Sequence, residues 1–321
     1  MNEIPQDATW VRFPRYVGDA VMQIAILRLL RQLDPAPLVA WGPAHTLGLL
    51  DGQGIVEATV PDAGKPGPWA LAALLRKHRA RRSVHFPKSL RPALAAWLAG
   101  VPERIGVSES LAGLFNTHSL PFWKGHGTCL ERYGRVLELR WPGLPEMPFP
   151  ALQGVAPVDL PSRPFICLMP GASTPAKAWE AEHFVRLAER IAAEGYLPVV
   201  QGSAGERALG DRVAGSHGLN ACGASLSEAI TWFAHAAGAV GNDSGLGHLA
   251  AACGAPTVSL FGPMDVEMFV PYGAQVRALR NEGLACLGCK LRNCPVEGHP
   301  CLAGIAPETA WQALMELGLR Q

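Results

Sequence analysis

The stretch from Gly238 to Pro263, GAVGNDSGLGHLAAACGAPTVSLFGP, places the tightest constraint on how this chain can fold. A short apolar strand ends in a polar turn, and Ser244 and Gly245 then open a helix of small residues that carries His248 before a second apolar strand closes the unit. Such a unit sets free backbone N–H groups and the positive end of a helix beside parallel strand ends, which suits an anionic ligand such as a diphosphate. An ordinary crossover with a capped helix would give the same pattern.

The second half of the chain repeats this strand, polar turn, helix order. An apolar strand at Phe165–Met169 runs into the turn 170–174, and the strand Leu197–Val200 ends in Gly202 and Ser203. Lys177 follows the first of these turns and can supply a mobile cation. Backbone donors, hydroxyls and one cation should therefore gather at one edge of a parallel sheet.

The first half opens in the same way, with a strand at Thr9–Phe13 and a helix of 3.6-residue periodicity at Ala20–Leu33. Asp19 falls at the turn between them, at or next to the helix N-cap. Two interpretations stay open: a capping carboxylate, or a carboxylate held at the mouth of a parallel sheet as a general base.

Charge is unevenly spread between the halves. Residues 1–155 hold 17 Lys and Arg against 12 Asp and Glu, whereas residues 156–321 hold 11 against 15. Lys88, Ser89 and Arg91 place two cations and a hydroxyl at a helix start, which suits an anionic group, and the run 76–82 is interpreted as a solvated helix end. A basic first half attracts an anionic partner, although solvated surface would also explain the asymmetry.

Length and composition fit two globular domains. The 321 residues are 49% hydrophobic and 17% charged, and the opening residues lack the basic and apolar regions of a secretion signal. The uncharged run 244–264 is interrupted by glycines and prolines and does not read as a membrane-spanning helix, so we expect a cytoplasmic protein. Nothing in the sequence indicates nucleic-acid binding. A proline-rich segment between Leu139 and Arg163 is interpreted as the linker between domains.

Several motifs taken together resemble glycosyltransferase family 9, the heptosyltransferases of lipopolysaccharide inner-core synthesis. The resemblance covers nearly the whole chain and includes the stretch 86–106 and residues 131–133, which look most like the heptosyltransferase II branch. The motifs are GDAVM at 18–22, PGA at 170–172, KAW at 177–179, GS at 202–203 with Glu206, NDSG at 242–245 with His248, and FGP at 261–263. Members usually carry an arginine in the segment corresponding to 107–115, which here has no basic residue.

The resemblance implies an α/β protein of the GT-B fold, with two Rossmann-like domains whose parallel sheets face a central cleft. Residues 1–155 would bind the acceptor, residues 156–305 would bind the nucleotide sugar, and residues 306–321 would form a C-terminal helix that packs back near the first domain. The implied reaction is inverting and metal-independent, with Asp19 as the general base and Lys177 stabilising the leaving diphosphate. The implied donor-binding residues are Gly171, Ser173, Thr174, Gly202, Ser203, Glu206, Asp243, Ser244, Gly245 and His248, and the acceptor-binding residues are Gly18, Lys88, Ser89 and Arg91.

The segment 286–301 holds a cluster of four cysteines, Cys286, Cys289, Cys294 and Cys301. Four thiols in one short loop match the ligand count of a closed structural zinc site, although their unequal spacing departs from paired CxxC motifs. Free thiols or disulfides are the alternatives, and disulfides are disfavoured in a reducing compartment. Catalysis itself requires no cofactor under the family resemblance.

The expected partners are an ADP-sugar donor and an anionic glycolipid acceptor, without nucleic acid. A lipid acceptor also implies peripheral contact with the inner face of a membrane. Two other functions fit the residues: another GT-B nucleotide-sugar enzyme, such as a different sugar transferase or an epimerase, and a non-catalytic sugar-nucleotide-binding protein.

Overall fold

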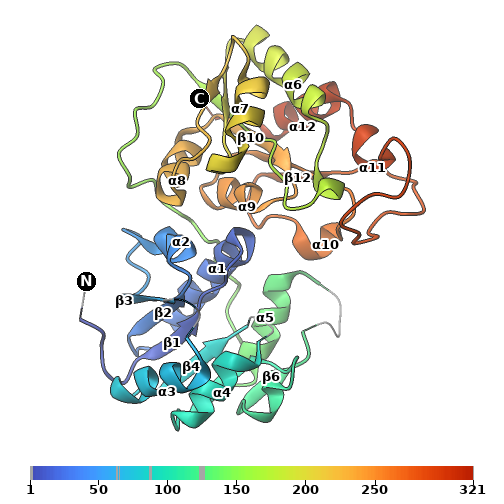
Figure 1. Cartoon of the computed structure of the whole chain (residues 1–321). Helices are drawn as coiled ribbons and strands as arrows, with labels where there is room; N and C mark the ends of the chain where they lie inside the picture. The colour runs from blue at the N-terminus through green and yellow to red at the C-terminus, as the bar shows by residue number, and fades with distance from the viewer. Residues whose placement is uncertain (1–2, 63, 65, 87–88, 123–126, 321) are drawn as a thin grey trace. The chain divides into compact units, whose positions relative to one another are not determined.

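The computed structural model describes residues 3–62, 64, 66–86, 89–122 and 127–320, and the chain divides into two compact units, residues 1–150 and 151–321 (Figure 1). The boundary precedes the predicted one, which lay after residue 155. Two hydrogen bonds explain its position. Arg28 Nε donates to the carbonyl of Pro150 at 2.6 Å, within the first unit, whereas the N–H of Leu152 donates to the carbonyl of Ala252 at 2.9 Å, within the second.

The first unit is built on a six-stranded parallel sheet in the order β3-β2-β1-β4-β5-β6. The strands are β1 (Thr9–Arg12), β2 (Leu38–Gly42), β3 (Ala58–Pro61), β4 (Arg82–His85), β5 (Glu103–Val107) and β6 (His118–Leu120). The order reverses direction between β1 and β4, so the connections after these two strands diverge and leave room for a ligand at their carboxyl ends.

Helices cover both faces of this sheet. The helical segments are α1 (Val17–Leu33), α2 (Ala44–Leu47), η1 (Gly48–Leu50), α3 (Pro68–Lys77), α4 (Leu90–Leu98), η2 (Ala112–Leu114) and α5 (Cys129–Glu138). Helices α3 and α4 pack beside each other, and Leu71, Leu75 and Ala95 bury their side chains against Trp10 and Trp41 of the sheet. Helix α1 packs against α5. Each unit thus has its own buried core, as two separately folded domains require.

The second unit repeats the architecture with the order β12-β11-β10-β7-β8-β9, and every strand pair is parallel. The strands are β7 (Phe165–Met169), β8 (Leu197–Val200), β9 (Leu219–Asn220), β10 (Gly238–Asn242), β11 (Thr257–Leu260) and β12 (Val276–Leu279). The helical segments are η3 (Pro175–Lys177), α6 (Ala181–Ala193), η4 (Ala204–Glu206), α7 (Arg207–Ala214), α8 (Leu226–His235), α9 (Gly245–Ala252), α10 (Val266–Phe269), α11 (Pro300–Ala303) and α12 (Pro307–Leu317). The direction of the strand order reverses between β7 and β10.

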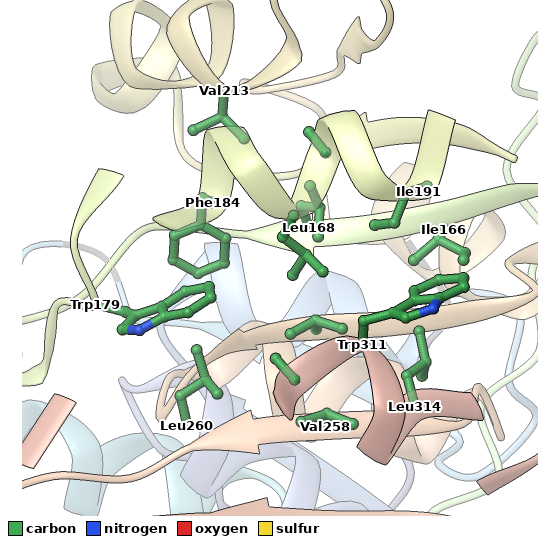
Figure 2. Close-up of a cluster of buried hydrophobic side chains, with 14 of the residues drawn as sticks. Ile166, Leu168, Trp179, Phe184, Ile191, Val213, Val258, Leu260, Trp311 and Leu314 are labelled. Carbon is green, nitrogen blue, oxygen red and sulfur yellow. The ribbon is translucent and has the colours of Figure 1, made fainter. Parts of the chain in front are cut away.

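The apolar core of the second unit lies between this sheet and helices α6 and α12 (Figure 2). Trp179 and Phe184 pack edge to face with ring centroids 4.8 Å apart, and Trp311 and Leu314 of α12 extend the same cluster. The C-terminal helix predicted at 306–321 is therefore an integral element of the second unit. Burial of two indole rings and about twenty other apolar side chains fixes the sheet edge that carries the candidate site.

Candidate functional site

The predicted donor-binding residues gather at the carboxyl edge of the second sheet, around the reversal between β7 and β10. The segment after β7, up to the end of η3, carries Gly171, Ser173, Thr174 and Lys177. The segment after β8, up to the end of η4, carries Gly202, Ser203 and Glu206, and the turn after β10 with the start of α9 carries Asp243, Ser244, Gly245 and His248. Ser173 is exposed and Thr174 is half-buried. Open parallel sheets bind ligands at this edge, where successive turns diverge.

Asn242, the last residue of β10, connects two of these turns. Its side-chain oxygen accepts a hydrogen bond from the N–H of Trp179 at 2.9 Å, and its side-chain nitrogen donates to the carbonyl of Pro170 at 2.8 Å. Trp179 is in turn held by its indole N–H, which donates to the carbonyl of Ile305 at 3.0 Å. One buried amide thus fixes the segment that carries Lys177 against β10. Asn242 belongs to the NDSG motif, but this role could not be predicted because both partners lie far away in sequence.

Lys177 and Asp243 form a largely buried ion pair across the reversal. Lys177 Nζ lies 2.8 Å from Asp243 Oδ2, and their side chains are 15% and 7% exposed. Burial raises the pKa of Asp243, while the Lys177 charge and hydrogen bond act in the opposite direction. Asp243 therefore holds the Lys177 cation at the sheet edge. A ligand with more negative charge could take the place of Asp243 as the partner of Lys177.

The start of helix α9 offers further polar groups beside this pair. Ser244 is the N-cap residue of α9, yet its side chain makes no capping hydrogen bond, and its buried hydroxyl has no partner among the described residues. Nδ1 of the buried His248, in the first turn, likewise lacks a partner among them. Burial, and then the Lys177 charge, lower the pKa of His248 to about 4, so this imidazole is neutral near pH 7. Lys177 is thus the cation at this point, and Ser244, His248 and the backbone N–H of Gly245 are neutral donors for an anion.

Glu206 extends over the glycines of the two neighbouring turns. Its Oε2 accepts hydrogen bonds from the Ser203 N–H at 2.6 Å and the Ser203 hydroxyl at 2.8 Å. A Cβ added at Gly171 would lie 2.1 Å from Glu206 Oε1, and one added at Gly202 would lie 3.0 Å from Oε2. The carboxylate therefore occupies the space above both glycines, where it can accept hydrogen bonds from hydroxyl groups of a ligand.

Gly171→Ala tests this arrangement. The new methyl group displaces the Glu206 carboxylate, so we expect KM for the donor to rise roughly tenfold, the scale of losing one hydrogen bond to a charged group, with kcat little changed. Gly205→Ala, in the adjoining turn, is the matched control because the nearest atom to its added Cβ is 3.9 Å away. Steady-state kinetics on both variants is the measurement, and equal KM values would contradict the assignment of Glu206.

In the first unit, Asp19 lies in the first turn of α1, which begins three residues earlier than predicted. Tyr16 is the N-cap residue, and its side chain makes no capping hydrogen bond. Asp19 therefore lies at the third helical position and not at the N-cap itself. The side chain is half-buried after the carboxyl end of β1, next to the strand reversal, and Gly18 precedes it. Burial raises the pKa of Tyr133, and the charge of Asp19 adds to the rise, which means that the carboxylate lies near this phenol.

A second group of charges lies at the same edge of the first sheet and was missed from the sequence. Arg12, at the end of β1, places Nη2 2.8 Å from Asp62 Oδ2 and its guanidinium 4.3 Å from the ring centre of Trp41. The predicted acceptor residue Arg91 also reaches Asp62, at 3.4 Å, and Ser89 is the half-buried N-cap residue of α4. Lys88 lies outside the described residues. An arginine within an apolar strand is the signal that could have pointed to Arg12.

The cysteine segment packs against the turn that carries Lys177. The N–H of Ala176 donates to the carbonyl of Arg292 at 3.1 Å, and Nε2 of His299 lies 2.9 Å from the Ala176 carbonyl oxygen. All four cysteines are free thiols and, with His299, line one apolar cavity of about 40 Å³. Within the described part of the chain, however, no three His, Cys, Asp or Glu side chains converge closely enough to hold a metal ion.

The glycosyltransferase family 9 (heptosyltransferase) model matches residues 69–299 of this sequence. The chain belongs to glycosyltransferase family 9. Lipopolysaccharide heptosyltransferase 2 of Escherichia coli strain K12 is 29% identical over 299 residues, which cover 83% of this chain and 86% of the relative. The structure of the E. coli ADP-heptose lipopolysaccharide heptosyltransferase II matches with a TM-score of 0.82 and 28% identity over 97% of this chain and 98% of that one.

The structure of the E. coli heptosyltransferase WaaC with ADP is more distant, with a TM-score of 0.72 and 18% identity over 97% of this chain and 100% of that one, and shows the fold alone. These comparisons confirm three predictions from the sequence: the family, the α/β GT-B fold class and the glycosyltransferase class of enzyme. In the ranges that the structure describes, no helix combines the length and the apolar character needed to cross a membrane.

Proposed function

We propose that this family 9 glycosyltransferase transfers a heptose from ADP-heptose to a lipopolysaccharide inner-core acceptor. The observation that carries the proposal is the Lys177–Asp243 ion pair at the carboxyl edge of β10, flanked by the Ser244 hydroxyl and Nδ1 of His248, neither of which has a partner among the described residues. This set of groups suits a nucleoside diphosphate. The heptosyltransferase 2 relative and the structure of the E. coli ADP-heptose lipopolysaccharide heptosyltransferase II support heptose and ADP as the two parts of the donor.

The proposed reaction is a single in-line displacement with inversion and needs no metal. The Asp19 carboxylate takes the proton of the acceptor hydroxyl, and the oxygen forms a bond to the anomeric carbon while the bond from that carbon to the diphosphate breaks. ADP leaves with the bonding electron pair. No covalent intermediate with the protein forms, so one carboxylate is sufficient.

Negative charge grows on the leaving diphosphate, and the second unit supplies the groups that oppose it. In the proposal Lys177 turns from Asp243 to the phosphate oxygens, while the Ser244 hydroxyl and the Gly245 N–H donate hydrogen bonds. Neutral His248 adds one more hydrogen bond, and Glu206 accepts from the ribose hydroxyls. Asp243, once released from Lys177, can accept from hydroxyls of the heptose.

The acceptor is proposed to be an anionic glycolipid bound by the first unit. Gly18 lies in the first turn of α1, which follows β1, and Ser89 and Arg91 lie at the start of α4, which follows β4. Arg12 adds a buried cation at the same edge. Because Asp62 pairs with both arginines, the net charge that they offer an acceptor is about one unit. A lipid acceptor also places the enzyme, in this proposal, in peripheral contact with the inner face of a membrane.

Release of ADP from ADP-heptose in the presence and absence of a lipid A–Kdo acceptor tests the proposed function. Acceptor-dependent ADP release supports transfer. Conversion of the donor without any acceptor would instead indicate an epimerase, binding of ADP-heptose without turnover would indicate a non-catalytic binding protein, and turnover of another nucleotide sugar would change the assigned donor.

A structural metal at Cys286, Cys289, Cys294 and Cys301 stays a separate prediction. The thiols share one cavity, but they do not converge in the described arrangement, so a tetrahedral site would require rotation of their side chains. We expect elemental analysis of protein purified without chelator or added metal to give about one equivalent of zinc or iron. Cys289→Ser should reduce that content, whereas Cys253→Ser, at a buried thiol elsewhere in the unit, should not. Metal content well below stoichiometric in the wild type would refute the prediction.

A further inference from the structure

The sequence between Asp62 and Glu103 holds eight Lys and Arg residues and no Asp or Glu. This stretch forms helices α3 and α4, which lie side by side on one face of the first unit (Figure 1). Arg82 is buried and paired with Asp34 and Glu103, so it contributes no surface charge. Arg76, Lys77, Arg79 and Arg81 are exposed. A one-sign surface of this kind attracts an anionic partner over about a Debye length.

The carboxyl ends of the two helices frame an open pocket of about 390 Å³, lined by Arg76, Arg79 and Arg81 and by one acidic residue, Asp7. Arg76 Nη2 donates to the carbonyl of Leu98 at 2.7 Å, which fixes the side chain and leaves its charge uncompensated. Arg79 lies 3.4 Å from Asp7, and both side chains are more than half exposed, so the pair is weak. The pocket thus retains a net positive charge of about two, which suits a phosphate group.

Large apolar side chains are exposed along the same two helices and on η2. Trp69 at the start of α3, Trp97 near the end of α4 and Leu114 of η2 are 73%, 51% and 76% exposed. Helix α4 packs against both α3 and η2, and the Trp97 ring contacts Phe115 at a centroid distance of 5.5 Å. A solvated helix end would account for the arginines but not for the exposed indoles and leucine. Arginines beside exposed tryptophan and leucine are typical of surfaces that lie at a lipid–water interface.

We propose that the α3–α4 face, defined by Trp69, Arg76, Arg79, Arg81, Trp97 and Leu114, docks on a membrane surface rich in anionic phospholipid. A lipid phosphate occupies the arginine pocket, and the indoles and Leu114 insert among the headgroups. The exposed apolar side chains favour a lipid surface over a nucleic acid, whose backbone would engage the cations alone. The proposal deepens the peripheral membrane contact given under the proposed function and does not depend on which sugar is transferred.

Cosedimentation with vesicles tests the proposal without donor or acceptor. The probes are vesicles of phosphatidylcholine alone and of an equimolar mixture of phosphatidylcholine with phosphatidylglycerol, at low salt. We expect the full chain to bind only the mixed vesicles. The triple variant Arg76→Gln/Arg79→Gln/Arg81→Gln should bind them roughly 100-fold more weakly, at about fivefold for each cation removed. Trp97→Ala should weaken binding about tenfold and leave its salt dependence unchanged, whereas loss of the arginines should reduce that dependence.

The matched control is Arg186→Gln/Arg190→Gln/Arg212→Gln, which removes three exposed arginines from α6 and α7 of the second unit. It should bind the mixed vesicles like the wild type, and thermal unfolding should show that all variants are folded. Several outcomes overturn the proposal: no vesicle binding by the wild type, equal loss in both triple variants, binding of millimolar inorganic phosphate without any vesicle binding, or binding of tRNA in place of vesicles. Because the assay contains no sugar, its failure leaves the transfer reaction to be judged by ADP release.

Discussion

Asp19→Asn is expected to reduce kcat by about 10²- to 10⁴-fold, the usual contribution of a general base, while the affinity for the ADP-sugar stays that of the wild type. The substitution keeps the size of the side chain and its hydrogen-bonding oxygen, but it removes the group that takes the acceptor proton. Tyr16, not Asp19, is the N-cap residue of α1, and Asn accepts hydrogen bonds at a helix start about as well as Asp does. Replacing the charge near the helix start costs only about 0.3–1 kcal/mol of stability.

Asp51→Asn is the matched control, because it removes an exposed carboxylate from the same unit at the end of η1. Its kcat should equal that of the wild type. The measurements are ADP release at saturating donor and acceptor, and equilibrium binding of ADP. A kcat within a few-fold of wild type in Asp19→Asn would exclude the general-base role, and a large loss of ADP affinity would indicate that the substitution acts on folding or on the donor.

The sequence predicted the elements whose signals are local. The strand, turn and helix of residues 238–252 are visible because an apolar run, polar turn residues and a small-residue helix follow one another without interruption. The start of α1 was placed too late, because Val17 and Gly18 read as the end of a turn. The structure begins the helix there, and the Ala20 N–H donates to the carbonyl of Tyr16 at 2.9 Å.

Features that depend on distant partners could not be read from the sequence. The two hydrogen bonds of Asn242 join residues 63 and 72 positions away, and no periodicity encodes such a contact. The ion pair of Lys177 with Asp243 also joins residues that lie far apart in sequence, so the pairing was not predicted, although both residues had been assigned to the donor site. In the cysteine segment, closeness in sequence was also not enough for a prediction. Its thiols are close in sequence, but left-handed backbone at Lys290 and His299 directs the loop, so spacing alone does not determine whether the thiols converge.

Lys177→Met should lower kcat by about 10²- to 10³-fold and weaken ADP binding, because it removes the one formal cation that this edge of β10 offers to the leaving diphosphate among the described donor-site residues. The substitution also leaves the Asp243 carboxylate buried without its partner. Removing one member of a buried pair costs about 3 kcal/mol or more, so a loss of stability would accompany the loss of rate. The single variant therefore cannot by itself distinguish the catalytic cation from a neutralising one.

The double variant Lys177→Met/Asp243→Asn separates these two roles. It removes the unpaired carboxylate and should recover most of the thermal stability lost in Lys177→Met, because no buried charge remains. If Lys177 stabilises the leaving diphosphate, kcat in the double variant should stay as low as in the single one, since the phosphate still lacks its cation. Recovery of kcat together with stability would show that Lys177 serves only to neutralise Asp243. Charge stabilisation of the departing ADP would then have to come from Ser244, His248 and the N-terminus of α9, all of which are neutral donors.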